Sequence, residues 1–568
     1  MADTLGSCLA RAAAIGAGKG LSFVDRDERE SVLSWADIHD RAAAVAGGLR
    51  ERGVRPGDGV AVVLPTAPEF FDAFFGAVLA GAVPVPLYPP VRLGRLDEYH
   101  ARTAGMLAAA RVRLVLAGGR TWRILGEAVA RAAPDLGCVP VADVRGAAFS
   151  HRARPGDLAM VQFSSGTTAD AKPVALTHAG ILANVRAMRE VFLEAGAAVE
   201  HAVSWLPLYH DMGLIGSVFV ALYHPASLTL IPPELFVVRP ALWLRAISRT
   251  RTPVSAAPNF AYALCTERVA DAEMEGVDLG GWRLALNGSE PVAPATLRRF
   301  AERFARWGFR REALCPVYGL SEATLAVTFS DWRTPFAAAR FDRAALAEGR
   351  VVASDDGVEL VSVGRPVPGV EVDAPDGAVG AIRVRGPSVM AGYLHQPGRT
   401  RQAIADGWLE TGDLGFFQDG LLYVSGRAKD VLILRGRNHA PHDVERAVDG
   451  VAGVRPGCAA AVSHRAEDAD EERLHVFVEA RRHDPGLADR CRDAVLEATG
   501  LDPGLVVVLA PGTLPRTSSG KIRRGETLRL WLSGSLTPPE RVTPWLLAGE
   551  LAKGTLAHWR RSLSRATR

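Results

Sequence analysis

Lysine is rare in this chain, and three of its occurrences mark short polar segments. The sequence contains 66 basic residues, of which only five are lysine. Lys172, Lys429 and Lys521 lie in SSGTTADAKPVALTH, SGRAKD and LPRTSSGK, which are rich in Gly, Ser, Thr or turn residues. A lysine ammonium is a compact charge on a flexible stem, whereas an arginine guanidinium is a wide planar fork. Lysines at these places favour an enzyme that handles phosphate groups.

The first segment has the composition of a phosphate-binding loop. It follows the apolar run LAMVQF and precedes an expected helix that begins near His178. Hydroxyls, exposed amides and the nearby Lys172 would form a cradle for a polyphosphate. The Gly-Lys-Ser/Thr ending of the Walker pattern is missing, and an ordinary turn is the alternative interpretation. The candidate residues are Ser164, Ser165, Gly166, Thr167 and Thr168.

Further candidates lie in segments with aromatic and acidic residues. His210, in SWLPLYHDMGLIG, would face a substrate carboxylate, or the segment is a helix start with Asp211 as its N-cap. In PVYGLSEAT, Tyr318 is suited to stack on a purine, and Glu322 to hold a magnesium ion. The alternative is a buried tyrosine and a surface glutamate. Ligands in open α/β sheets bind at the carboxyl ends of strands, where such segments are expected.

The C-terminal candidates surround an expected domain junction. Asp413, in TGD, could accept hydrogen bonds from both ribose hydroxyls, or it could be a turn aspartate. Arg427 and Lys429 lie at the junction itself. Lys521 lies in TSSGKIRR, a loop suited to bringing one positive charge into a cleft.

The elements that must position these residues have an α/β pattern. Between about residues 35 and 320, apolar runs such as VAVVLP and VPVPLYPP alternate with helical stretches such as EFFDAFFGAVLAGA. This alternation predicts mainly parallel sheets covered by helices. From about residue 361, short β-rich pieces separated by turns predict a small β-barrel-like subdomain.

The expected organisation is a large N-terminal domain and a small mobile α+β C-terminal domain. The N-terminal domain spans residues 1–428, and the C-terminal domain spans residues 429–568. Within the first, residues 329–363 form an insertion segment and residues 364–426 the β-rich subdomain. A chain of 568 residues exceeds the size of a single core, which agrees with such a division.

Composition excludes several classes of protein. The net charge of +3 does not favour nucleic-acid binding. The six cysteines show no metal-ligand spacing and no disulfide framework. The run Met212 to Tyr223 is too short to span a bilayer, and no secretory signal is evident. We therefore expect a cytoplasmic protein without a membrane span.

Taken together and in order, the polar segments resemble those of adenylate-forming enzymes, the superfamily of acyl-CoA synthetases, luciferases and peptide-synthetase adenylation domains. The resemblance runs from about residue 30 to 525 and is greatest to the fatty acyl-AMP ligases. It is carried by SWLPLYHDMGL, AAPNFAYALC, NGSEPV, YGLSEATL, TGDLGFFQDGLLYVSGRAKD and RGRNHAPHDVE.

The resemblance implies roles for the individual residues. Ser164 to Thr168 and Lys172 would hold the β- and γ-phosphates of ATP, and Lys429 would be the hinge of the C-terminal domain. Lys521, Glu322 and His210 would be catalytic, with Glu322 binding Mg²⁺ and Lys521 bridging the substrate carboxylate and the α-phosphate. The remaining residues implied to bind ATP or AMP are Gly288, Ser289, Glu290, Tyr318, Gly319, Ser321, Asp413 and Arg427.

The chain departs from the family pattern at two places. The phosphate loop of the family usually reads Gly-x-Pro-Lys-Gly, whereas here Ala169 to Pro173 read Ala-Asp-Ala-Lys-Pro. Because both glycines are absent and Pro173 fixes its own φ, a stiffer loop is expected. His442 lies where the subfamily more often has glutamine.

Three functions follow from the resemblance. The favoured one is ATP- and Mg²⁺-dependent activation of a fatty or related carboxylic acid, followed by transfer to a separate acyl carrier protein of polyketide or nonribosomal peptide assembly. The insertion at residues 329–363 favours it, since a similar insertion distinguishes acyl-AMP ligases from acyl-CoA ligases; the alternative is a surface loop. The others are an acyl-CoA synthetase and a non-catalytic acyl- or nucleotide-binding relative.

Overall fold

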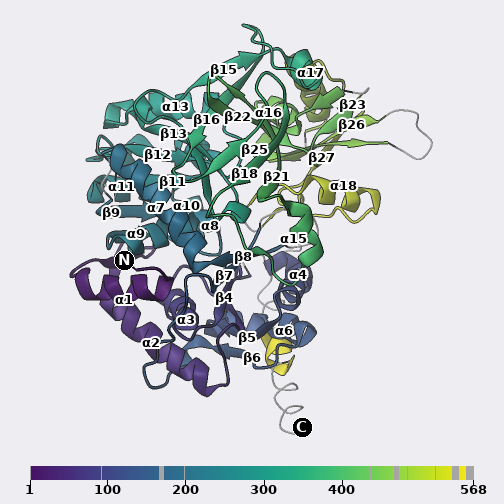
Figure 1. Cartoon of the computed structure of the whole chain (residues 1–568). Coiled ribbons are helices and arrows are strands. Elements are labelled where there is room, and N and C mark those ends of the chain that lie inside the picture. Colours follow the sequence, from purple (N-terminus) through teal and green to yellow (C-terminus); the bar gives the residue numbers. More distant parts are fainter. Residues whose placement is uncertain are drawn as a thin grey trace.

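The computed structural model shows several sheets flanked by helices, with the C-terminal elements packed against the large N-terminal part (Figure 1). It describes residues 2–90, 93–164, 172–196, 199–251, 253–434, 437–465, 472–482, 484–517, 520–539, 549 and 551–557. Ser165, Gly166, Thr167 and Thr168 of the expected phosphate loop lie outside the described residues.

The first parallel sheet has the strand order β4-β3-β5-β6. Helix α3 between β3 and β4 begins at Pro68, whose fixed φ suits the first helical position. Four phenylalanines of α3 are almost fully buried, and burying one such side chain contributes roughly 1.5–3 kcal/mol. Helices α4 and α6 pack against each other beside this sheet (Figure 1). The bounds are β3 Gly59–Val63, α3 Pro68–Leu79, β4 Val83–Pro86, α4 Leu96–Ala109, β5 Val112–Ala117, α6 Gly126–Ala132 and β6 Gly137–Pro140.

Two further sheets complete the parallel framework. In the order β2-β1-β10-β9, only β2 is antiparallel to its neighbour. The largest sheet begins with parallel β11-β12-β13 and continues through β14-β16-β22-β21-β18-β17. The bounds are β1 Gly20–Val24, β2 Glu30–Ser34, β9 His201–Ser204, β10 Ser227–Leu230, β11 Val254–Ala257, β12 Leu284–Asn287, β13 Leu314–Gly319, β14 Ala326–Phe329, β16 Val358–Pro366, β17 Glu371–Asp373, β18 Gly380–Arg385, β21 Trp408–Gln418 and β22 Leu421–Arg427.

The β-rich segment is therefore continuous with the large sheet. Its strands β17, β18, β21 and β22 are antiparallel and joined to β14 through β16. Alternating buried and exposed residues along β18 show that one face is packed. The prediction of an α/β fold with mainly parallel sheets and a β-rich addition is confirmed.

The segment around Lys172 differs locally from the expected strand-to-helix connection. Strand β7, Leu158–Phe163, is as expected, but it pairs antiparallel with β8, Pro173–Thr177, before helix α7, His178–Glu194, begins. Pro173 is the first residue of β8, a position where proline is tolerated because it needs no donor. Thr177 caps α7 by accepting a hydrogen bond from the Gly180 amide. The expected helix start near His178 is confirmed, whereas strand β8 before it was not predicted.

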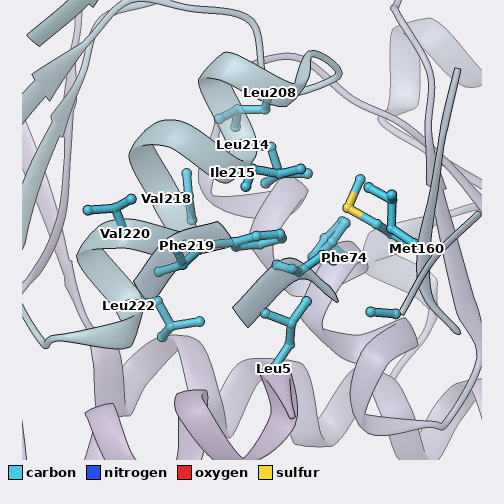
Figure 2. Packing of buried hydrophobic residues seen from close by; sticks show 14 of the residues in the cluster. Leu5, Phe74, Met160, Leu208, Leu214, Ile215, Val218, Phe219, Val220 and Leu222 are labelled. Atoms are coloured by element: carbon cyan, nitrogen blue, oxygen red, sulfur yellow. The ribbon is translucent and has the colours of Figure 1, made fainter. Parts of the chain in front are cut away.

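The longest apolar run is buried in the core of the N-terminal part. It forms α8, Asp211–Gly213, a π-helical segment, Leu214–Phe219, and α9, Val220–Tyr223. Phe219 packs against Phe74 of α3 with ring centroids 5.7 Å apart (Figure 2). Within the described residues, no helix combines the length and hydropathy that a bilayer crossing requires.

The C-terminal elements have a hydrophobic core of their own. The β25-β26-β27 sheet packs against α16 and α17, and Val444, Val476 and Cys491 are among the buried residues between them. The bounds are α16 Pro441–Asp449, β25 Val454–His464, β26 Arg473–Ala480, α17 Leu487–Thr499, β27 Leu505–Leu509 and α18 Arg524–Leu532. A separate core is what an independently rotating domain would need.

Candidate active site

Strand pairing brings together three predicted nucleotide-binding residues. Asp413 on β21 and Arg427 on β22 are directly paired, and the Arg427 Nε donates to Asp413 Oδ1 at 3.0 Å. The hydroxyl of Tyr318, at the end of β13, donates to the other oxygen, Oδ2, at 2.7 Å. The Asp413 side chain is almost entirely buried, so these contacts compensate for its burial. The three side chains form one rigid polar group.

The predicted magnesium ligand is linked to the phosphate-loop lysine through a tyrosine. The hydroxyl of Tyr393 donates to Glu322 Oε1 at 2.9 Å, and Lys172 Nζ lies 3.2 Å from the same hydroxyl. Burial lowers the pKa of Lys172, and the nearby Glu322 opposes this shift. Tyr393 lies on the short strand β19, Gly392–Tyr393, which pairs with β8. This arrangement places a cation and a carboxylate on either side of one hydroxyl.

Ser321 and Asp211, each the first residue of a short helical turn, contact each other through their side chains. The Ser321 hydroxyl donates to Asp211 Oδ2 at 2.5 Å, while Oδ1 accepts from the Met212 amide. The residue that precedes α8 is His210, so Asp211 is the first helical residue instead of the expected N-cap. Burial lowers the pKa of His210 to about 4. The positive charges of Lys521 and Arg102 also lower it, whereas the negative charge of Asp211 opposes the shift. His210 is therefore neutral near pH 7.

Glu290 has a structural contact besides its predicted place in the pocket. Its Oε1 accepts a hydrogen bond of 2.7 Å from the Phe260 amide, in the first turn of α12, Asn259–Arg268. A carboxylate at this position offsets the partial positive charge of a helix N-terminus. Burial nevertheless raises the pKa of Glu290, and Lys521 is among the neighbours that oppose the shift.

Close backbone approaches explain two of the predicted glycines. A Cβ at Gly319 would lie 1.8 Å from the Leu325 carbonyl oxygen, and one at Gly288 would lie 2.8 Å from that of Val317. Neither distance is compatible with a side chain. Ser289, the next residue, has a φ of 72°, a conformation that is uncommon outside glycine. Gly288 thus lets the chain after β12 lie against β13, and Gly319 lets the end of β13 lie against the residue that precedes β14.

Lys521 comes from the C-terminal elements and lies among residues of the N-terminal part. Its amide donates to Thr517 Oγ1, which closes a tight turn in the loop. Burial and the Arg427 charge lower the pKa of Lys521, whereas three carboxyl groups raise it. Those groups belong to Glu290, Asp211 and Asp413. One ammonium thus faces three separate predicted segments.

Additional contacts that the sequence alone did not indicate hold this loop in place. Arg524, three residues after Lys521, pairs with Asp430 at 3.0 Å and with Glu445 at 2.7 Å. Arg523 pairs with Glu98 of α4 at 3.5 Å. No motif marked Arg524, since arginine is the common cation of this chain, and only its burial singles it out.

The structure therefore gathers most of the predicted site. Lys429 precedes Asp430 at the expected domain junction. The charge of Lys429 lowers the pKa of Lys172, so the junction lies near the phosphate-loop lysine. Tyr393 is the principal residue missed, because nothing in AGYLHQP has a local pattern of a binding site. The roles of the individual residues stay predictions.

A family model described as AMP-binding enzyme matches residues 13–394. The chain belongs to this family. It is 34% identical over 533 residues to a Caulobacter vibrioides protein described as a candidate acyl-CoA synthetase, which covers 90% of this chain and 92% of that protein. It is 32% identical to the medium-chain-fatty-acid–[acyl-carrier-protein] ligase JamA of Moorena producens, and the match covers 92% of this chain and 93% of JamA.

A solved structure from a study of fatty acyl-adenylate ligases of E. coli and L. pneumophila has a similar fold. Its TM-score is 0.87 at 32% identity, with 94% of this chain and 98% of that chain covered. The predicted resemblance to fatty acyl-AMP ligases is confirmed, and the protein is an adenylate-forming enzyme. Enzymes of this family use ATP.

Proposed function

We propose that the enzyme converts a fatty carboxylic acid and ATP into an acyl-adenylate and pyrophosphate, and then passes the acyl group to a separate carrier protein. The observation that carries the first half is the position of Lys521. A lysine of the C-terminal elements lies among Asp211, Glu290 and Asp413 of the N-terminal part. In the proposed reaction, the two anions that meet beside Lys521 are the substrate carboxylate and the α-phosphate of ATP.

The rigid group around Asp413 supports a nucleoside site. Asp413 and Arg427 would bind the ribose, and Tyr318, fixed through its hydroxyl, would stack on adenine. Gly288, Ser289 and Glu290 would line the adenine and acyl pocket as a separate set. Because Tyr318, Asp413 and Arg427 hold one another in place, little ordering of these side chains is needed for ATP binding.

The phosphates would lie between the Lys172 side and the Lys521 side. Ser321, at the end of β13, would contact the α-phosphate, and Lys172 with the loop before it would hold the β- and γ-phosphates. Glu322 suits Mg²⁺, a cation that prefers oxygen ligands and is usually held by one or two carboxylates with substrate phosphates. Its Oε2 is left for the metal when Oε1 accepts from Tyr393. When bound, Mg²⁺ would neutralise phosphate charge.

The chemistry joins two anions that repel each other. The carboxylate oxygen forms a bond to the α-phosphorus, and the bond from that phosphorus to the pyrophosphate oxygen breaks. The Lys521 ammonium would stabilise the charge that gathers on the carboxylate and α-phosphate oxygens, because preorganised charges act strongly in a partly buried site. His210, which is neutral near pH 7, would orient the substrate carboxylate without adding a positive charge.

The insertion segment supports a carrier protein as the acceptor. It comprises residues 329–363, and Phe341 within it is buried against Phe416 and Tyr423. From the same segment, Arg343 pairs with Asp443 at 3.3 Å and Glu348 with Arg437 at 3.5 Å. Both partners belong to the C-terminal elements, which we propose form a domain at residues 429–568, joined to residues 1–428 at a hinge that contains Lys429.

These contacts oppose the rotation that a CoA-using enzyme would need. If the C-terminal domain turns about Lys429, both ion pairs must break before His442 and its neighbours reach the substrate side. The name of JamA, a fatty-acid–[acyl-carrier-protein] ligase, agrees with this acceptor. The relative from Caulobacter favours a second candidate, transfer to CoA.

The acceptor is tested with the intact enzyme, ATP, Mg²⁺ and a panel of fatty acids. CoA and a phosphopantetheine-bearing carrier protein are offered separately, and the products are identified by mass. We expect acyl-AMP with every accepted acid and an acyl thioester on the carrier. Acyl-CoA formed at a comparable rate would overturn the proposed acceptor, while absence of acyl-AMP would overturn the activation step itself.

A further inference from the structure

A histidine and two carboxylates meet between helices α4 and α6, and none of the three is a residue assigned to catalysis. Asp97 and His100 lie on α4, and Glu127 lies in the first turn of α6. One ligand atom from each side chain lies within 4.8 Å of the other two. Figure 1 shows the two helices side by side next to the β5–β6 edge of the first sheet.

A backbone contact assigns one ring nitrogen of His100 as a hydrogen-bond donor. Its Nε2 lies 3.0 Å from the Ile124 carbonyl oxygen, which can only accept, so Nε2 carries a proton. The residue is 1% exposed, and its Nδ1 has no hydrogen-bond partner among the described residues. Nδ1 instead lies 3.2 Å from Glu127 Oε2. Nδ1 therefore lies beside a carboxylate oxygen without a hydrogen bond between the two atoms.

A bound cation would resolve this contact. Histidines that bind metals commonly donate their second ring N–H to a backbone carbonyl, as His100 does to Ile124. Two ligand atoms at zinc distances and a tetrahedral angle lie about 3.3 Å apart, close to the observed Nδ1–Oε2 separation. The other oxygen of Glu127 pairs with Arg131, which leaves Oε2 for the metal.

We infer that Asp97, His100 and Glu127 bind Zn²⁺ between α4 and α6. The mixture of one imidazole and two carboxylates suits zinc better than magnesium, which prefers oxygen ligands alone. Three protein ligands leave a fourth position for water, which exposed Asp97 keeps accessible. The bound ion ties the beginnings of the two helices together. This inference does not depend on the proposed function.

The site has a consequence for the neighbouring catalytic loop. Arg95, just before α4, donates to the carbonyls of Thr513 and Thr537 at 3.0 and 2.9 Å, and Glu98 pairs with Arg523. Helix α4 is thus a surface on which the C-terminal elements rest. A metal that fixes α4 against α6 would stiffen that surface.

Zinc titration of the chelator-treated full-length protein, without ATP or Mg²⁺, tests the inference by calorimetry and thermal unfolding. Asp97→Asn is the first variant, since this exposed residue is not needed for packing; His100→Asn is the second. Asp40→Asn is the control, because Asp40 also lies 3.2 Å from a histidine, His39, but this pair is not part of such a three-residue group.

We expect zinc to raise the melting temperature of the wild type and of Asp40→Asn. The Asp97→Asn variant should lose one bound zinc per chain or bind it at least about tenfold more weakly, because even outer-shell changes cost that much. Wild-type stoichiometry, affinity and thermal shift in Asp97→Asn would overturn the inference. Failure of the wild type to bind zinc would also overturn it, leaving the contact between His100 and Glu127 as a structural one.

Discussion

Breaking the two ion pairs between the insertion and the C-terminal elements should release acyl transfer to CoA. The perturbation is the double variant Arg343→Ala with Glu348→Ala. These substitutions remove the contacts to Asp443 and Arg437 without touching Lys521 or the predicted nucleotide-binding residues. The hydrophobic anchor at Phe341 also stays in place.

The size of the effect follows from the exposure of the pairs. The Arg343 and Asp443 side chains are 37% and 16% exposed, and those of Arg437 and Glu348 are 56% and 40% exposed. Exposed pairs of this kind contribute about 0.2–1 kcal/mol each, so the two together hold the domain by roughly 0.4–2 kcal/mol. Because 1.4 kcal/mol is about a factor of ten, the rotated population should rise roughly 2- to 30-fold.

The assay compares acyl-CoA formation with acyl-AMP formation in the same preparation. The ratio of acyl-CoA to acyl-AMP should rise roughly 2- to 30-fold in the double variant. Added salt should raise the same ratio in the wild type, since salt screens exposed ion pairs. Arg333→Ala is the matched control, because it breaks an exposed ion pair of the same segment with Asp331. An unchanged or lower ratio in the double variant would refute the reasoning.

Two further predictions concern binding and stability. Asp413→Asn should weaken ATP binding by about 1.5–3 kcal/mol, the usual worth of hydrogen bonds to a charged group; calorimetry with unchanged affinity would contradict this. Burial lowers the pKa of His178 from 6.5 to about 4, so the unfolded chain binds this proton more readily and stability falls as the pH falls from 6.5 towards 4. The loss at pH 5 is roughly 2 kcal/mol, and His178→Gln should show a shallower decline in thermal unfolding; an identical slope would argue against it.

The sequence predicted elements better than it predicted their contacts. The run LAMVQF is strand β7 without error, since a short, nearly continuous apolar run is a local signal, and all of its residues after Leu158 are buried. The next strand, β8, was missed because PVALT is short and its partner strands β7 and β19 lie on either side of it in the sheet. The antiparallel pairing of Phe163 with Pro173 could not be predicted, because the segment before Lys172 was interpreted as a phosphate-binding loop or an ordinary turn and neither specifies a strand partner.

In the candidate site, too, the sequence predicted individual residues better than the contacts between them. Motifs identified Tyr318, Asp413 and Arg427 separately, but their shared hydrogen bonds join residues up to 95 positions apart and arise only from the order β13-β14-β16-β22-β21. Tyr393 was not predicted, because its role comes from lying between Lys172 and Glu322. The hydrogen bond that Glu290 accepts at the start of α12 likewise joins residues 30 positions apart.

The measurement that bears most directly on the role of Lys521 is acid-dependent pyrophosphate release by Lys521→Ala. Loss of one charge that stabilises a transition state typically costs ~10²–10³ in rate, so this variant should release almost no pyrophosphate while still binding ATP. Lys521→Arg should also be poor, since the planar fork does not fit one point between two oxyanions. Lys19→Ala, in the turn between α1, Leu5–Ile15, and β1, should behave as wild type. Near-normal pyrophosphate release by Lys521→Ala would contradict its assignment.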